Sequence, residues 1–225
     1  MSLPDGSWTS LDGQPTDLVS RVAARATAEP DLAAVVTANG DELSYTELLE
    51  RATAASAVVR ERSRGDGVAV ITDRGPSSAI ALLAAAMVRC PVALVDDSQS
   101  LDRIEALLDR LDLPVIRAAE EFCDRSSDPP QPGDPILILT TSGSTSDPKV
   151  ALVQSPRWLV DSSTEHSARC QLVAADAGSY ANVAKYTLAM WRGGTVVALG
   201  PEDSSVTGLV DAVVRFGVTR LAATP

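Results

Sequence analysis

The chain has 225 residues, 45% of them hydrophobic and 22% charged, and its 30 acidic and 19 basic side chains give a formal net charge of −11. This composition is typical of a globular protein with one large or two small domains. A surface this acidic repels phosphate backbones and anionic lipids, which argues against a nucleic-acid binder or a membrane-surface protein. The longest apolar run, 79–88, is about half as long as a bilayer-spanning helix.

The cysteine content indicates a reducing compartment. Cys90, Cys123 and Cys170 are an odd number without metal-ligand spacing, so we expect free thiols in a cytoplasmic protein. No charged segment followed by an apolar stretch opens the chain, so we expect no secretory signal. With one histidine and no CxxC pair, the sequence argues against a zinc site built from His and Cys, and we expect no metal site in this chain.

The first elements are a helix and a hairpin. Thr16 is placed to cap a helix whose apolar face begins at Leu18. The apolar stretch 33–37 then meets the turn Asn39-Gly40, and apolar character resumes immediately afterwards. This pattern predicts a β-hairpin.

A second helix begins at Ser44, because Ser44 and Glu47 have the spacing of a capping box. Asp96 and Asp97 end a later strand just before Ser98, where we expect them to cap the next helix rather than to form a metal or acid pair. The remaining predicted elements are, in order, strand 68–72, helix 76–89, strand 92–95, helix 101–111, strand 114–116, strand 136–139, a strand after Lys149, helix 157–169, helix 183–191, strand 195–199, helix 206–216 and strand 218–222.

Short apolar strands that alternate with helices of ten or more residues predict an α/β fold, with parallel or mixed sheets covered by helices on both faces. The run 126–135 contains four prolines and one glycine and therefore excludes regular structure. We accordingly divide the chain into a first α/β half (1–123), a Pro-rich linker (124–135) and a second α/β half (136–225) that carries the chemistry.

The segment 136–153, ILILTTSGSTSDPKVALV, places six hydroxyl side chains around one glycine, with a lysine at the far end. Hydroxyls and backbone N–H groups donate hydrogen bonds to phosphate oxygens, Gly143 allows close approach of the backbone, and Lys149 adds a positive charge. The segment therefore favours a polyphosphate site, although it does not match the Walker pattern GxxxxGK[ST]. The alternative is an ordinary Ser- and Thr-rich turn between strands.

The stretch TSGSTSDPK resembles the phosphate-binding signature [ST]SG[ST]TGxPKG of the AMP-forming adenylate ligases, which include acyl-CoA synthetases, nonribosomal peptide synthetase adenylation domains and luciferases. Four further stretches resemble motifs of the same superfamily in the same order. They are LSYTEL at 43–48, AAAMVRCPVALVD at 84–96, WRGGTVVAL at 191–199, and the strand at 218–225.

The resemblance implies the front half of the large N-terminal domain of an adenylate-forming ligase. Such an enzyme joins a carboxylic acid to ATP, with Mg²⁺, to give an acyl-adenylate and pyrophosphate, and usually passes the acyl group to a thiol of CoA or a carrier protein. The resemblance assigns binding of the departing pyrophosphate to one group of residues. These are Thr141, Ser142, Gly143, Ser144, Thr145 and Lys149.

Two departures from the family pattern bear on the phosphate loop. Ser146 and Val150 stand where the family usually has glycines, and a serine that had to adopt a positive φ would cost on the order of 1 kcal/mol. Another departure lies in the region matching FDxS, where amino-acid-activating relatives present an aspartate to the substrate amine. Tyr180 takes that position, and with Asn182 and Val183 it is assigned to the substrate pocket. We therefore expect an aryl or acyl acid without an α-ammonium group.

Family enzymes continue for about as many residues again, so we expect this chain alone to be catalytically incomplete. The main alternative is a naturally truncated, non-catalytic homologue that serves as an interaction or scaffolding module, which Ser146 and Val150 favour. A third interpretation is the phosphate-binding domain of an unrelated α/β enzyme. We also expect the last strand to leave an exposed edge, and hence a homodimer that covers it.

Overall fold

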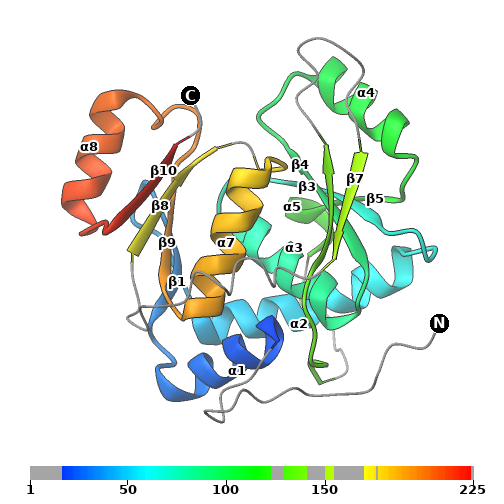
Figure 1. Cartoon of the computed structure of the whole chain (residues 1–225), viewed down its shortest axis with the longest axis horizontal. Helices are drawn as coiled ribbons and strands as arrows, with labels where there is room; N and C mark the ends of the chain where they lie inside the picture. Colours follow the sequence, from blue (N-terminus) through cyan, green and yellow to red (C-terminus); the bar gives the residue numbers. More distant parts are fainter. Residues whose placement is uncertain (1–16, 123–128, 141–149, 155–169, 176, 224–225) are drawn as a thin grey trace.

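The structure is a computed structural model that describes residues 17–122, 129–140, 150–154, 170–175 and 177–223 (Figure 1). It contains two five-stranded mixed sheets with helices on both faces of each, so the predicted α/β fold is confirmed. The predicted helix 157–169 lies outside the described residues.

Sheet I has the strand order β10-β8-β9-β1-β2. Its neighbours pair in parallel except β1 and β2, which form the predicted antiparallel hairpin. The turn contains Gly40, whose φ of 90° suits glycine. The strands are β1 (Ala33–Thr37), β2 (Glu42–Ser44), β8 (Cys170–Ala174), β9 (Thr195–Ala198) and β10 (Arg220–Ala223).

Sheet II has the strand order β5-β3-β4-β6-β7 and is parallel except for the antiparallel pair β6–β7. Each sheet therefore combines strands from before and after the segment 124–135, and the chain-order halves do not coincide with the sheets. The strands of sheet II are β3 (Val68–Thr72), β4 (Pro91–Asp96), β5 (Val115–Arg117), β6 (Ile136–Thr140) and β7 (Val150–Gln154).

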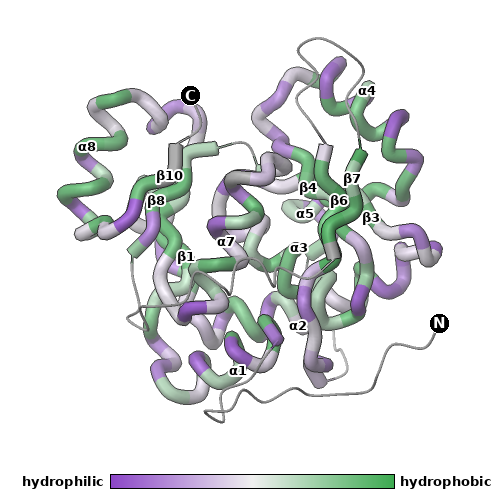
Figure 2. Tube along the Cα trace, in the orientation of Figure 1, coloured by the Kyte–Doolittle hydropathy of each residue, from purple (hydrophilic) through white to green (hydrophobic). Residues whose placement is uncertain are grey.

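The helices form an inner layer between the sheets and two outer layers. The inner layer is α1 (Leu18–Ala28), α2 (Tyr45–Arg62), α3 (Pro76–Met87) and α7 (Tyr180–Arg192). The ten residues of α3 from Ser78 to Met87 are all buried, which explains why this helix is apolar on every side (Figure 2). Outside, α8 (Val206–Arg215) packs on sheet I and α4 (Leu101–Leu111) on sheet II, while the short α5 (Ala118–Glu121) follows β5.

Local signals explain where the first helices begin. The capping box is confirmed, since the Glu47 N–H donates to Ser44 Oγ (3.2 Å) and the Ser44 N–H donates to Glu47 Oε2 (2.9 Å). The expectation that Thr16 caps α1 is wrong. The cap is Asp17, whose Oδ1 accepts from the N–H of Ser20 (2.9 Å) and also from that of Gly133 (2.8 Å), 116 residues away.

Two differences from the predicted elements concern the second half of the chain. Strand β8 was not predicted, although it lies inside sheet I between β10 and β9. Helix α7 begins at Tyr180, three residues before the predicted start, because Ser179 caps it. None of the helices that the structure describes combines the length and the apolar character that a bilayer crossing requires.

Candidate functional site

The predicted phosphate loop joins β6 to β7. Its assigned residues, Thr141 to Thr145 and Lys149, lie outside the described residues, as does Ser146. The strands on either side fix its two ends, because Thr140 and Val150 face each other in the antiparallel ladder. Val150 is thus regular β-strand, a conformation that suits its branched side chain.

The entry to this loop lies at the carboxyl edge of sheet II. Strands β3, β4 and β6 run parallel, so the residues that follow Thr72, Asp96 and Thr140 all emerge at one edge. In open α/β sheets, ligands bind outside the carboxyl ends of parallel strands. The structure therefore places the start of the loop at the edge where a binding site is expected.

The predicted pocket residues form the first turn of α7. Ser179 caps this turn by accepting a hydrogen bond at Oγ from the Asn182 N–H (3.2 Å). Tyr180 is 52% exposed, whereas Asn182 and Val183 are 1% and 2% exposed. Partial desolvation raises the pKa of the Tyr180 hydroxyl, so this side chain is uncharged at neutral pH and offers no anion to a substrate amine.

The Asn182 side chain is unusual among the described residues. Both its Nδ2 and its Oδ1 are buried without a hydrogen-bond partner. A buried amide of this kind costs free energy, and native structures contain few of them. A buried amide without partners is therefore a candidate for contact with a ligand.

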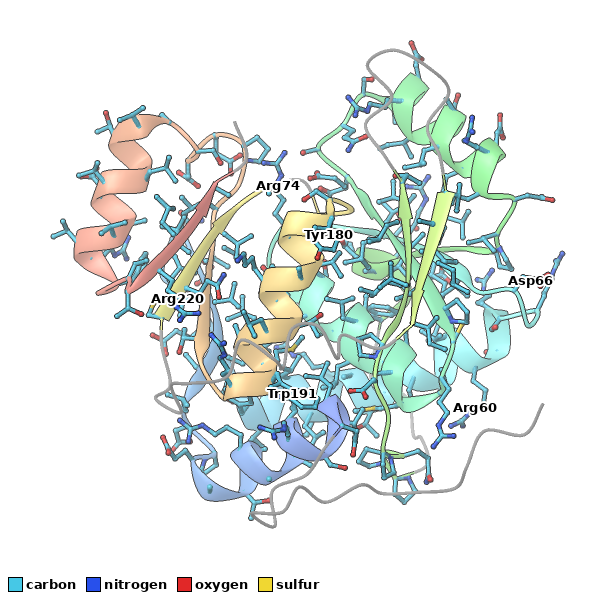
Figure 3. All side chains as sticks on the ribbon, viewed as in Figure 1. Arg60, Asp66, Arg74, Tyr180, Trp191 and Arg220 are labelled. Carbon is cyan, nitrogen blue, oxygen red and sulfur yellow. The ribbon has the colours of Figure 1, made fainter. Side chains whose placement is uncertain are left out.

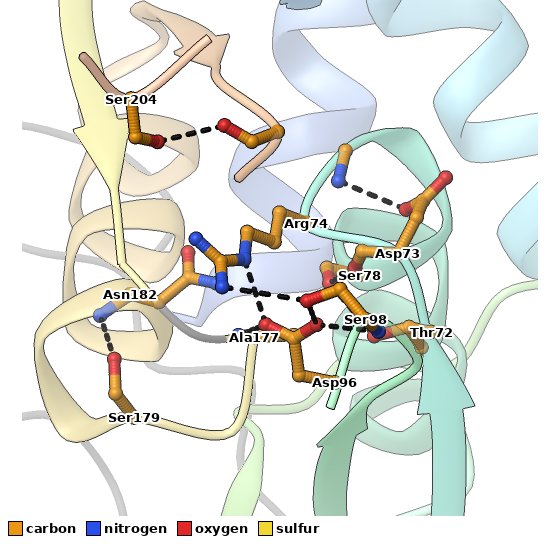
Figure 4. Close-up of polar contacts among 12 residues, drawn as sticks. Thr72, Asp73, Arg74, Ser78, Asp96, Ser98, Ala177, Ser179, Asn182 and Ser204 are labelled. Carbon is orange, nitrogen blue, oxygen red and sulfur yellow. Dashed lines mark hydrogen bonds and ion pairs between the residues drawn. The ribbon is translucent and has the colours of Figure 1, made fainter. Parts of the chain in front are cut away.

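A polar junction joins the start of α7 to sheet II (Figure 4). Asp96, at the end of β4, is completely buried. Its Oδ2 accepts from Arg74 Nε (2.8 Å) and from the Ala177 backbone N–H (2.9 Å). Its Oδ1 accepts from the N–H of Ser98 (2.9 Å) and from the Ser98 hydroxyl. One carboxylate thus connects two strand ends of sheet II with the segment that leads into α7.

Two further contacts attach α7 and the segment before it to sheet II. The Tyr186 hydroxyl donates to the backbone carbonyls of Arg74 and Gly75, which precede α3. Gly178 lies so close to the Leu94 carbonyl oxygen that a Cβ would collide with it. In Figure 3, Arg74 and Tyr180 lie near the N-terminal end of α7, and Trp191 lies at its other end.

The two adjacent carboxyls at the end of β4 are shifted in opposite directions. Burial tends to raise the pKa of Asp96, but hydrogen bonds from Ser98 and Ala177 and the charge of Arg74 outweigh it and lower this pKa. The pKa of Asp97 is raised, by partial burial first and then by the negative charges of Asp73 and Asp96. Asp96 is therefore a structural carboxylate.

The expectation that Asp96 and Asp97 cap the next helix is wrong. The cap residue of α4 is Ser100, and its side chain makes no capping hydrogen bond. Asp96 instead turns into the junction because an arginine follows the neighbouring parallel strand. The sequence does contain a signal for this pair. An arginine follows strand β3, and an aspartate ends the neighbouring parallel strand β4.

The described residues form neither a metal-binding cluster nor a reactive thiol. Within these ranges, no group of three or more His, Cys, Asp or Glu side chains is arranged to hold a metal ion. Cys90 is buried and Cys170 is half-buried, and burial raises the pKa of both thiols, which disfavours nucleophilic thiolates. The donor set of the phosphate loop, by its hydroxyls and its lysine, suits a nucleotide polyphosphate.

Comparisons with known proteins agree with the motif pattern. The family model described as AMP-binding enzyme matches residues 22–125. The hybrid PKS-NRPS synthetase pynA of Aspergillus niger is 26% identical over 159 residues, which are 57% of this chain and 4% of that protein. The nonribosomal peptide synthetase ungA of Aspergillus violaceofuscus is 28% identical over 159 residues, 58% of this chain and 2% of that protein. The chain thus spans a small fraction of these relatives.

Solved structures share the fold. The N-terminal subdomain of NpsA from Klebsiella oxytoca, in complex with 3-hydroxybenzoyl-AMSN, has a TM-score of 0.74 at 22% identity over 91% of this chain and 59% of that one. An artificially fused adenylation–PCP di-domain from the same organism has a TM-score of 0.75 at 22% identity, with 91% and 47% coverage.

Proposed function

We propose that this chain, which has the fold and sequence signature of the N-terminal part of an AMP-forming adenylate ligase, is part of an enzyme that activates a carboxylic acid with ATP. The predicted likeness to this superfamily is confirmed for the N-terminal part, and the family-level assignment as an adenylate-forming ligase is supported.

The observation that carries the proposal is a shared sheet edge. The entry to the phosphate loop at Thr140 and the junction that holds the start of α7 both lie at the carboxyl edge of sheet II. An enzyme that joins an acid to the α-phosphorus of ATP needs its acid and its polyphosphate side by side. This arrangement supports a site that accepts both.

On the ATP side, Thr141, Ser142, Gly143, Ser144, Thr145 and Lys149 are proposed to hold the β- and γ-phosphates. A carboxylate oxygen attacks the α-phosphorus, the bond to the β-phosphate oxygen breaks, and its electron pair leaves with pyrophosphate. Hydrogen-bond donors and a cation at the departing group stabilise the charge that develops there. Mg²⁺ would accompany the phosphates and neutralise part of their charge.

On the acid side, Tyr180, Asn182 and Val183 are proposed to line the pocket. Tyr180 is neutral, so an α-ammonium group finds no counter-charge from it, and an aryl or acyl acid is favoured. The 3-hydroxybenzoyl ligand named for the NpsA structure supports an aryl acid as the first candidate. Transfer to the thiol of a carrier protein or of CoA would follow, and the fused adenylation–PCP structure supports the carrier.

Pyrophosphate exchange in the protein that carries this chain tests the proposal. We expect exchange with a non-amino acid, and loss of at least about tenfold in rate for Lys149→Ala, because a charge-assisted contact to phosphate disappears. Lys185→Ala, which changes the other lysine of the sequence, is the matched control and should keep the rate. If no acid supports exchange, the non-catalytic interaction module favoured by Ser146 is the better assignment.

The remaining proposals concern partners and compartment. The free thiols of Cys90 and Cys170 support a reducing, cytoplasmic location. A homodimer is supported by an exposed apolar surface, which we call the α8–β10 flank. It consists of Val206, Val210, Val214 and Leu221, with exposed fractions of 79%, 55%, 78% and 55%.

The valines of this flank lie beside the edge strand. Arg215 reaches from α8 to the carbonyls of Ala38 and Asn39, after β1. Successive residues of a helix are rotated by about 100° about its axis, so Val206, Val210 and Val214 point roughly 100–180° away from Arg215. Arg215 points toward β1, so the valines point toward β10, at the other end of sheet I. Leu221 pairs with Leu172, which packs under α8, so Leu221 lies on the same face of sheet I. A second copy that pairs its β10 antiparallel to this one would cover both surfaces.

A further inference from the structure

We propose that Asp96, together with Arg74, is a positioning residue that fixes the first turn of α7 as the acid-binding wall of the site. The inference rests on the proposed carboxylate activation and names residues that the motif comparison does not assign to it. Asp96 is not a catalytic residue here, because it acts through Ala177 and α7 rather than on the substrate.

The Asp96–Arg74 pair is largely removed from water. Asp96 is fully buried and Arg74 is 15% exposed at its side chain, so both charges lose most of their hydration. Buried ion pairs contribute little net stability, and apolar residues of similar volume often replace them without loss. What the carboxylate does supply is geometry, since its two oxygens accept from three separate segments: Arg74, Ser98 and Ala177.

Contacts with sheet II hold α7 and the segment that leads into it. The Ala177 N–H and the close approach of Gly178 to Leu94 fix the segment just before α7, and the Tyr186 hydroxyl contact fixes the middle of the helix. Their partners lie in or just after β3 and β4 of sheet II. The start of α7 is therefore attached to the sheet whose edge carries the entry to the phosphate loop.

Asn182 is the third residue of α7 and lies in its first turn. Its buried amide has a donor and an acceptor without hydrogen-bond partners, which lowers the stability of the folded state. Folding alone does not explain why a polar residue occupies this position. Polar groups that recognise a ligand must be held to within about half an ångström by their surroundings. The Asp96–Arg74 pair provides such support, and the unpaired amide is the group that it presents to the acid.

The test uses Asp96→Asn, which keeps the side-chain shape but replaces an acceptor oxygen with a donor. We expect amide hydrogen exchange in 177–183 to become at least about tenfold faster, with 206–216 unchanged. In the protein that carries this chain, KM for the acid should rise about tenfold while KM for ATP stays within about twofold. Glu121→Gln, which breaks the surface pair with Arg62 (2.6 Å), is the matched control.

A second variant addresses loss of folding. Arg74→Met with Asp96→Leu removes both charges together, so it should cost less stability than removing one partner alone. It also removes the acceptor for Ala177, so the same changes in amide hydrogen exchange and in KM are expected. Unchanged exchange in 177–183 in both variants would overturn the positioning role. Faster exchange with equal changes in both KM values would overturn its link to the acid. If no acid supports pyrophosphate exchange in the unaltered protein, that result would instead refute the proposed function.

Discussion

The junction around Asp96 and the α8–β10 flank reverse the usual distribution of polar and apolar groups. At the junction a fully buried carboxylate and a partly buried guanidinium lie between elements and hydrogen-bond to each other. On the flank, three valines and a leucine face outward beside β10, which among the described strands pairs with β8 alone. Buried polar groups and exposed apolar patches are the two departures that carry information about function. We therefore expect a positioning role for the junction and a contact role for the flank.

The largest expected effect is at the junction. Asp96→Ala should lower the free energy of unfolding by about 3 kcal/mol, because it leaves Arg74 without its counter-charge and Ala177 without its acceptor. Urea unfolding measures this change. The control Glu121→Ala, which breaks the more exposed pair with Arg62, should cost less than about 1 kcal/mol. Equal losses in the two variants would remove the distinction between a buried and a surface pair.

A pair of glycine substitutions compares the packing of the two regions. Gly178→Ala places a methyl group against the Leu94 carbonyl oxygen and should cost about 2–3 kcal/mol. Gly217, just after α8, has a φ of 60° and open space around it, so Gly217→Ala should cost only about 1 kcal/mol of backbone strain. Thermal unfolding measures both losses of stability. A larger loss in Gly217→Ala than in Gly178→Ala would contradict the close approach of the segment before α7 to β4.

The pH dependence of stability separates the adjacent carboxyls. The pKa of Asp96 is lowered by folding, so its contribution is fully present above the unfolded pKa of about 4 and is lost as pH falls through the folded value. The pKa of Asp97 is raised by folding, so its contribution opposes folding as pH rises above the unfolded pKa of about 4 and is complete above the folded value. At about pH 7, Asp96→Asn should therefore destabilise and Asp97→Asn should stabilise. Both differences should shrink in strong acid, and changes of the same sign would contradict the assignment.

Features that depend on residues close together in sequence could be predicted, whereas contacts between distant residues could not. The capping box at Ser44, the strand 68–72 and the helix 101–111 are encoded by residues close together in sequence, and the structure has them where they were predicted. The junction depends on Arg74, Asp96 and Ala177, which are brought together only by the pairing of β3 with β4 and by the docking of α7. Periodicity carries no information about such contacts.

Strand β8 shows the same limit for an element. Its five residues, Cys170–Ala174, become recognisable as a strand only from their neighbours on both sides in sheet I. For the site, the motif resemblance named the loop and the start of α7, and the structure places Tyr180, Asn182 and Val183 on one helical turn. The burial of the Asn182 amide without partners could not be read from the chain, because burial is set by the packing of α7.

The smallest effect on stability is expected at the flank, together with a clear effect on association. Val210 is 55% exposed, so Val210→Asp should change the free energy of unfolding by less than about 0.5 kcal/mol. If the flank is the contact between two copies, sedimentation should show a dimer for the unaltered chain and a monomer for Val210→Asp, because the charge would be buried against apolar side chains. Leu101→Asp is the matched control, since Leu101 is 74% exposed on α4, outside the flank. A monomeric unaltered chain at high micromolar concentration, or equal dissociation by both variants, would contradict the contact role of the flank.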